Sequence, residues 1–352
     1  MDLNTTVTFT NITRSIRLRE LYPNAFLLFF ISNISVGIIG AVLCLLLIVS
    51  ICATRTLRGG AQILIIHLQS AEAFLCILNI TSSITMYFPR FQLTSFSCSY
   101  FFFFIMAVSQ VHQWSSFLLA VNRVVAIIFP LHYHIWTQRQ MIVAAIGVSW
   151  VLPLCINIPI AAGIIGKFDV TNAWPGCAVY PPKENPGTQI ALLSVGFYFP
   201  LAGTFFCYLA ILLYVLLSKY VKSHGKIGPV QLVKRATSQR TYNKRILISK
   251  SLFISSLWFL ACYLPFSVVS SYFFRVVMMS TTPLWLRVWY NIGYLGGPVA
   301  FFTLCKDYRR GISFVIQRCY AFITLQDMRI VILPLSSGKF TNDRSNGAPY
   351  DY

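Results

Sequence analysis

Long runs of apolar residues, separated by short polar segments, make up most of the chain. Seven of these runs lie at 24–53, 61–87, 95–129, 139–165, 188–218, 246–275 and 284–304. Each has at least about 20 residues, the length that a helix needs to cross the hydrocarbon core of a bilayer at about 1.5 Å per residue. The pattern therefore predicts an all-α membrane protein, built as a bundle of seven transmembrane helices.

The segments outside these runs divide the rest of the chain. We expect an N-terminal tail at 1–23, the bundle over 24–304, a short amphipathic eighth helix over 305–319 and a C-terminal tail at 320–352. The eighth helix is indicated by one apolar stripe among basic residues, formed by Tyr308, Ile312, Val315 and Cys319. Such a helix lies in the membrane interface. Cys319 is a candidate for palmitoylation, with an unmodified cysteine as the alternative.

Composition and charge set the orientation in the membrane. The chain is 57% hydrophobic and only 11% charged, whereas about a quarter of the residues of a soluble domain are charged. The net charge of +19 could indicate nucleic-acid binding, but 20 of the 28 lysines and arginines fall in alternate segments that include 219–250. These segments are therefore expected inside, with the N-terminus extracellular at the plasma membrane. The basic inner face attracts anionic membrane lipid, and nucleic acid is not an expected partner.

The outer side carries two kinds of candidate modification. Asn4 and Asn11 begin glycosylation motifs in the exposed tail, whereas the same motif at Asn33 and Asn79 falls inside apolar runs and is not expected to be modified. Of the ten cysteines, only Cys98 and the cysteine of "WPGCAVY", Cys177, face the oxidising outer side. A disulfide between these two is expected, and two unpaired thiols are the alternative.

An arginine without an acidic neighbour ends the third run. Arg123 lies 25 residues after Cys98, or about 37 Å of helix, and therefore at the inner boundary, where it could simply extend to the lipid headgroups. Motifs elsewhere in the chain favour a more specific role for this arginine. "NRVVAIIFPLHY" around it resembles the Asp-Arg-Tyr motif of the rhodopsin-like (class A) G-protein-coupled receptors. Over roughly 25–319 the chain also resembles that family at Trp150, at Pro200 and Tyr208, in "FLACYLPF", in "GGPVAFF" and in "CKDYRRGI".

This resemblance implies a receptor that binds an extracellular ligand and activates a heterotrimeric G protein, without enzymatic activity, metal or cofactor. The positions that match the coupling surface are Asn122, Arg123, Pro130, Leu131, Tyr208 and Arg245. The positions that match the activation switches are Glu72, His112, Phe259, Tyr263, Pro265, Gly297, Pro298 and Phe301. Both prolines remove a backbone donor and bend their helices, so the inner end of the sixth helix can swing outward.

The chain departs from the family at several of these positions. Asn122 replaces the aspartate, and Arg245 stands where many members carry an acid, so we expect packing rather than an ion pair to hold the inactive state. Tyr263 replaces a tryptophan, while Gly297 and Phe301 replace the asparagine and tyrosine of the seventh-helix motif.

Glu72 is the only acid within any apolar run, and an intramembrane carboxylate indicates a functional site. In the family this position binds sodium. Here His112 matches a usual serine and Gly297 has lost a side-chain ligand, so a protonated or His112-paired Glu72 is expected instead. A buried acid with no switching role is the alternative.

The positions that match the family's ligand cavity are Ile105, Met106, Ser109, Gln110, Phe266, Ser270, Arg287 and Asn291. Ile105 stands where amine receptors carry an aspartate, and Asn291 stands where opsins carry the retinal lysine. The ligand is therefore neither a biogenic amine nor retinal. Arg287 could pair with an anionic ligand or a peptide carboxylate, although such an arginine more often extends to lipid headgroups.

Three other kinds of protein could share this hydropathy pattern. A decoy receptor would bind ligand without coupling, and the motif losses leave that possibility open. A transporter or channel would show half-repeats and several buried polar groups, and an enzyme would need a catalytic constellation; neither pattern is found. The degenerate motifs also look similar to those of divergent invertebrate chemosensory receptors.

Overall fold

The computed structural model describes residues 22–53, 60–88, 94–170, 177–180, 191–192, 194–224, 232–272 and 281–332. Six of the described helices are long and apolar enough to cross a membrane. They are α2 (Pro23–Ala53), α3 (Gly60–Tyr87), α4 (Ser95–Ile128), α6 (Arg139–Ala161), α8 (Phe199–His224) with the π-helical turn η3 (Ser194–Tyr198) before it, and α9 (Leu232–Tyr272).

The seventh predicted span is divided. It consists of α11 (Thr282–Ile292), a 3-10 turn η5 (Gly293–Leu295) and α12 (Gly296–Leu304). At this break the span lies close against α9, since a Cβ on Gly296 would come within 2.4 Å of the Trp258 ring. Trp258 also donates its indole N–H to the Ile292 carbonyl at 3.1 Å, which satisfies a backbone acceptor at the end of α11.

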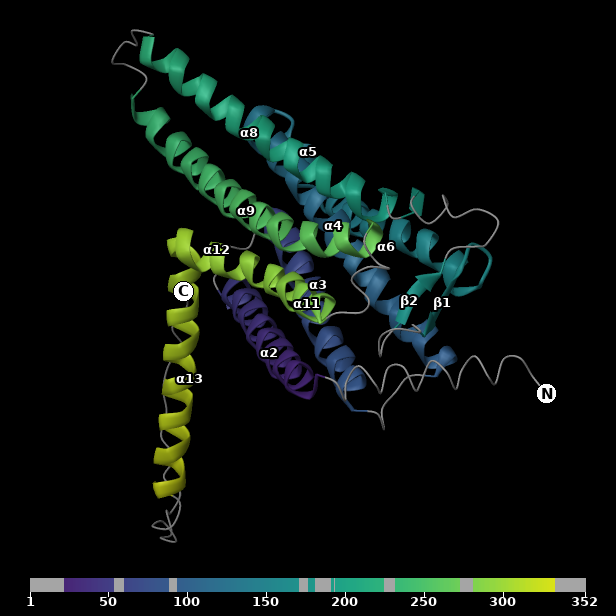
Figure 1. The fold of residues 1–352 in the computed structure, drawn as a ribbon. Coiled ribbons are helices and arrows are strands. Elements are labelled where there is room, and N and C mark those ends of the chain that lie inside the picture. Colours follow the sequence, from purple (N-terminus) through teal and green to yellow (C-terminus); the bar gives the residue numbers. More distant parts are fainter. Residues whose placement is uncertain are drawn as a thin grey trace, which may run out of the picture. The chain divides into compact units, whose positions relative to one another are not determined.

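The long helices form one bundle around α4, which packs against α3, α6, α8 and α9. Figure 1 shows α8 and α9 running side by side next to it. Buried side chains form an inner cluster that includes Tyr208 and Phe301, a middle cluster that includes Phe259 and Tyr263, and an outer cluster around Phe29. The predicted seven-helix architecture is confirmed.

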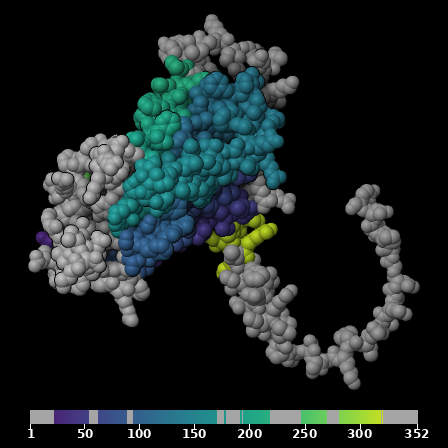
Figure 2. Space-filling model, turned by 90° about the vertical axis from the view of Figure 1, so that its right-hand side faces the viewer, coloured from purple at the N-terminus to yellow at the C-terminus, as the bar shows by residue number. Residues whose placement is uncertain are grey.

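Large apolar side chains are also exposed along the bundle, among them Val143 and Val151 on α6 and Leu213 on α8. Figure 2 shows a face of the molecule on which α4, α6 and α8, coloured blue to green, form a continuous surface. Such helices are apolar on every side because lipid covers the faces that other helices do not.

The outer loop between α6 and α8 contains a hairpin that the hydropathy pattern does not show. The strands β1 (Lys167–Val170) and β2 (Cys177–Tyr180) pair antiparallel, with Val170 opposite Cys177. The predicted disulfide between Cys98 and Cys177 is present and ties β2 to the start of α4. Phe168 is buried and packs edge-on against Phe102 of α4 at 5.6 Å, so the hairpin is anchored over the outer end of the bundle.

Several element ends differ from the prediction. The helix α9 begins at Leu232, before the apolar run at 246, because a helix continues into polar sequence once it leaves the membrane. The helix α13 (Lys306–Ile332) likewise continues beyond the expected end of the eighth helix at 319.

The chain divides into two compact units, 1–312 and 313–352. In the first unit Tyr308 is buried, its ring packs on Phe301 at 5.1 Å, and its carbonyl accepts a 2.8 Å bond from the Ser50 hydroxyl.

Candidate functional site

Glu72 and His112 form a buried contact that joins α3 and α4 at the centre of the bundle and is an ion pair when His112 is protonated. His112 Nε2 lies 3.0 Å from Glu72 Oε1, and both side chains are almost fully buried. The other carboxylate oxygen, Oε2, accepts from Gln69 Nε2 at 2.7 Å and from Cys44 Sγ at 3.8 Å. Since every one of these neighbours can donate a hydrogen bond, Glu72 is the acceptor and His112 presents its Nε2–H.

Gly297 makes room for this arrangement. A Cβ at this position would lie 3.0 Å from both Gln69 Nε2 and Glu72 Oε2. The Gln69 amide therefore fills the space that a larger residue at 297 would need. Hydrogen-bond donors from α2, α3 and α4 thus occupy both oxygens of the carboxylate, which reduces the cost of burying it.

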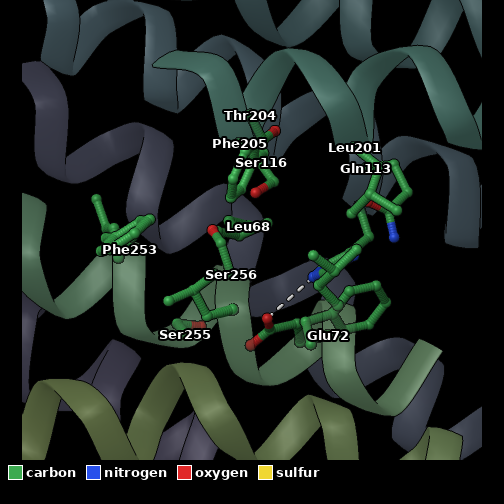
Figure 3. Close-up of a pocket in the computed structure, with 15 residues that line it drawn as sticks. Leu68, Glu72, Gln113, Ser116, Leu201, Thr204, Phe205, Phe253, Ser255 and Ser256 are labelled. Carbon is green, nitrogen blue, oxygen red and sulfur yellow. Dashed lines mark hydrogen bonds and ion pairs between the residues drawn. The ribbon is translucent and has the colours of Figure 1, made fainter. Parts of the chain in front are cut away.

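A small cavity lies beside the pair, between α3, α4, α8 and α9. Its volume of about 30 Å³ gives room for about two water molecules. Figure 3 shows Glu72 at one end of this cavity and Thr204 and Phe205 at the other. The hydroxyl-bearing residues of the lining are Ser116, Thr204, Ser255 and Ser256. Polar partners for water are thus present next to a buried carboxylate.

A series of ring contacts connects the pair to α9 near Pro265. The Phe259 ring lies 5.1 Å from the His112 ring and 5.7 Å from the Tyr263 ring, and Tyr263 in turn stacks on Phe197 at 6.0 Å. Both α9 residues precede Pro265, which lies inside the helix and removes one backbone donor. A movement of α9 at this proline would therefore change the contact between Phe259 and His112.

Arg123 is buried at the inner end of α4, with 2% of its surface exposed. Its Nε and Nη2, and Oδ1 of Asn122, have no hydrogen-bond partner among the described residues. Tyr208 and Tyr308 lie close enough to feel its charge. Burial raises the pKa of Tyr308, and the Arg123 charge acts in the opposite direction. Among the described residues, two tyrosines thus lie near this cation and no acid forms an ion pair with it.

Other predicted coupling positions are spread over the same inner side. Leu131, directly after Pro130, is 91% exposed, ahead of the short helix α5 (Tyr133–Trp136). Tyr208 is buried within the inner cluster. The side chains of Arg245 and Cys319 lie outside the described residues, as do Asn4 and Asn11.

The predicted ligand positions lie in the outer half of the bundle, away from the cavity. Gln110 is buried and its Oε1 accepts from Asn157 Nδ2 at 2.8 Å. Asn291 is buried and its Nδ2 donates to Asn33 Oδ1 at 2.5 Å. Ile105, Met106 and Phe266 are half-buried, and the Ser270 side chain is not among those described. None of these positions lines the cavity beside Glu72.

A cluster of hydrogen-bonded polar side chains that were not predicted as site residues adjoins these ligand positions. Asn33 donates to Ser83, and Ser83 donates to the Asn79 carbonyl at 2.8 Å, which links α2 and α3 to Asn291. The Tyr290 and Tyr294 hydroxyls bond to each other and interact with Ser109. The one sequence signal for Tyr290 and Tyr294 is their spacing of one helical turn in an apolar run.

The chain is similar in sequence and fold to known proteins. The family described as "7 transmembrane receptor (rhodopsin family)" matches residues 44–292. Rhodopsin of Galeus melastomus is 23% identical over 303 residues, which cover 84% of this chain and 77% of that protein. Adenosine receptor A2a of Canis lupus familiaris is 25% identical over 275 residues, 72% of this chain and 63% of that protein. The crystal structure of squid rhodopsin matches with a TM-score of 0.70 at 14% identity, over 89% of this chain and 93% of that chain.

Proposed function

Because the chain belongs to the rhodopsin family of seven-transmembrane receptors, we propose that it binds an extracellular ligand and activates a heterotrimeric G protein through the inner ends of α4, α8 and α9. The ligand is neither a biogenic amine nor retinal, since Ile105 and Asn291 lack the required carboxylate and amine. The receptor works at the plasma membrane with its N-terminus outside, where Asn4 and Asn11 carry glycans.

The observation that carries the coupling proposal is the state of Arg123. A buried guanidinium without an acidic partner among the described residues is costly, so it gains free energy when acceptors reach it. An outward swing of the inner end of α9 about Pro265 would open the bundle beside Arg123. The C-terminal helix of a G protein would then enter, with backbone carbonyls that the arginine can bind.

The Glu72–His112 pair is the proposed switch. In the family a sodium ion binds this carboxylate, whereas here the donors of Gln69, Cys44 and His112 already contact both of its oxygens. His112 also touches Phe259 of α9. A shift of α9 would therefore change the surroundings of the ion pair, and the state of the pair would in turn favour one position of α9.

The test is G-protein recruitment in cells that carry Arg123→Ala or the wild type at equal surface density, across all G-protein classes and a ligand library. We expect a signal in the wild type that the substitution abolishes. Arg139→Ala, which removes an exposed arginine at the start of α6, is the matched control and should leave the signal unchanged. Equal recruitment by the wild type and Arg123→Ala would contradict the proposal.

A second candidate is a receptor that binds ligand without coupling. It is favoured by Phe301, which is fully buried in the inner cluster and has no hydroxyl, and by the absence of a side chain at Gly297. Gly297 lies against Glu72, and Phe301 packs on Tyr308, which interacts with the Arg123 charge. Ligand binding to the wild type without recruitment of any G protein would support this second function.

A further inference from the structure

Arg287 turns into the bundle instead of extending to the membrane surface. Its Nη2 donates to Ser82 Oγ at 2.5 Å, and its Nη1 contacts Met86 Sδ at 3.1 Å. Both partners belong to α3, so the guanidinium bridges α11 and α3 in the outer half of the bundle. The expected extension to the lipid headgroups is therefore not what the structure shows.

The described residues offer this cation no counter-charge. Their ion pairs are Glu72 with His112 and Lys167 with Asp169, and neither involves Arg287. The titratable groups that interact with its charge are the Tyr290 and Tyr294 hydroxyls. An arginine does not give up its proton in a protein, so it cannot become neutral as a buried lysine does. Its side chain is partly buried, and this burial is costly until an anion arrives.

A second group at the same place has unused capacity. Asn291 lies one turn after Arg287 and on the same face of α11. Its Nδ2 is used by Asn33, but its Oδ1 is buried and has no hydrogen-bond partner among the described residues. An unpaired buried acceptor beside an uncompensated cation indicates a polar ligand with an anionic group and a donor.

The charge balance selects the class of anion. Lys167, the other cation described on the outer side, is exposed and already paired with Asp169. One guanidinium neutralises one negative charge, and its planar fork fits a carboxylate with two parallel hydrogen bonds. A phosphate monoester would bring a second charge for which the described residues provide no partner.

We propose that Arg287 binds the carboxylate of the receptor's ligand, a monocarboxylic acid that enters between α3 and α11 from the outer side. This inference rests on the proposed function as a ligand-activated receptor. It adds the chemical class of the ligand and names Arg287 as the residue that selects it.

The test measures binding without a G protein, on purified receptor in lipid nanodiscs. The midpoint of thermal unfolding is followed with sodium benzoate and sodium octanoate, and with neutral benzamide and octanamide, at constant ionic strength. The acids should raise the midpoint of the wild type in proportion to the logarithm of their concentration, and the amides should not. The rise should vanish in Arg287→Gln, persist in part in Arg287→Lys and remain in Lys167→Gln.

Equal effects of acids and amides, or a rise that persists in Arg287→Gln, would overturn the inference. A carboxylate of the chain itself is tested with Glu20→Gln and Glu184→Gln, whose positions lie outside the described residues. The inference would fail if either substitution raised the affinity for the acids and if adding Arg287→Gln to that variant had no further effect on stability. The counter-charge of Arg287 would then be a carboxylate of the chain itself. Since no G protein takes part, this failure is distinct from a failure of Arg123 to couple.

Discussion

The indole N–H of Trp289 donates to the backbone carbonyl of Ala261 at 3.2 Å. Ala261 is the residue whose carbonyl would accept from position 265 in an unbroken helix, and Pro265 has no N–H to give. A side chain of α11 thus satisfies the acceptor that the proline leaves free in α9. In the core of a bilayer no water is available for that task, so this carbonyl of α9 depends on the seventh span for its donor.

Trp289→Phe should destabilise the receptor, because it keeps an aromatic ring and removes only the donor. An unpaired carbonyl in this setting costs about 1 kcal/mol. We expect a lower midpoint of thermal unfolding than for Trp285→Phe, which changes an equally exposed tryptophan of α11 that has no hydrogen-bond partner among the described residues. In a Pro265→Ala background the effect of Trp289→Phe should shrink, since the helix then supplies its own donor. An undiminished effect there would show that the indole ring, and not its N–H, is what matters.

Breaking the central ion pair should be more costly than replacing both partners. His112→Ala leaves Glu72 without its partner on α4, and losing one partner of a buried pair costs about 3–5 kcal/mol. The double variant Glu72→Gln and His112→Ala should recover most of that loss. Chemical or thermal unfolding of the wild type, of Glu72→Gln, of His112→Ala and of the double variant in nanodiscs forms a double-mutant cycle. Simple additivity of the two single effects would argue against a coupled pair.

The stability of the receptor should not depend on sodium. His112, Gln69 and Cys44 occupy the carboxylate oxygens that a sodium ion would need. The midpoint of thermal unfolding should therefore be the same in sodium chloride and in choline chloride. In His112→Ser, where a smaller side chain opens space beside Glu72, a sodium-dependent rise is expected. A sodium effect in the wild type would mean that the ion displaces one of these donors.

Asn122→Asp should lower the basal signal. Arg123 is buried beside Asn122 and has two nitrogen atoms without a partner among the described residues. A carboxylate at position 122 would hold the guanidinium in the closed bundle and make it less available to a G protein. Recruitment without ligand, at matched surface density, measures this directly. Asn122→Ser, which adds no charge, is the control, and an unchanged basal signal in Asn122→Asp would count against packing as the main restraint.

Gly296→Ala should destabilise the contact between the sixth and seventh spans. The added methyl group would meet the Trp258 ring at 2.4 Å, and overpacking of this kind costs about 1–3 kcal/mol. Gly147→Ala in α6 is the matched control, since the described residues place no atom within 4 Å of its added Cβ. There alanine should be neutral or slightly stabilising, because it favours the helix. Thermal unfolding of the two variants side by side separates packing from helix propensity.

The existence and order of the spans follow from the sequence by itself, which also predicts their orientation. A bilayer requires about 20 apolar residues per crossing and places basic loops inside, so hydropathy and charge are sufficient. The disulfide between Cys98 and Cys177 is expected from the same predicted topology, which places both cysteines on the oxidising side, and the structure contains this disulfide. The position of Arg123 at the inner end of α4 could be predicted in this way as well.

Only the tertiary structure decided which faces of the helices meet. Lipid is as apolar as the interior of the bundle, so the pattern of apolar residues does not show how each helix is rotated. Two contacts depend on that rotation. They are the hydrogen bond from Trp289 to the Ala261 carbonyl and the packing of Gln69 against Gly297. The inward direction of Arg287 depends on it too, because a long side chain near a helix end can reach either the headgroups or a neighbouring helix, and Ser82 and Met86 lie within its reach.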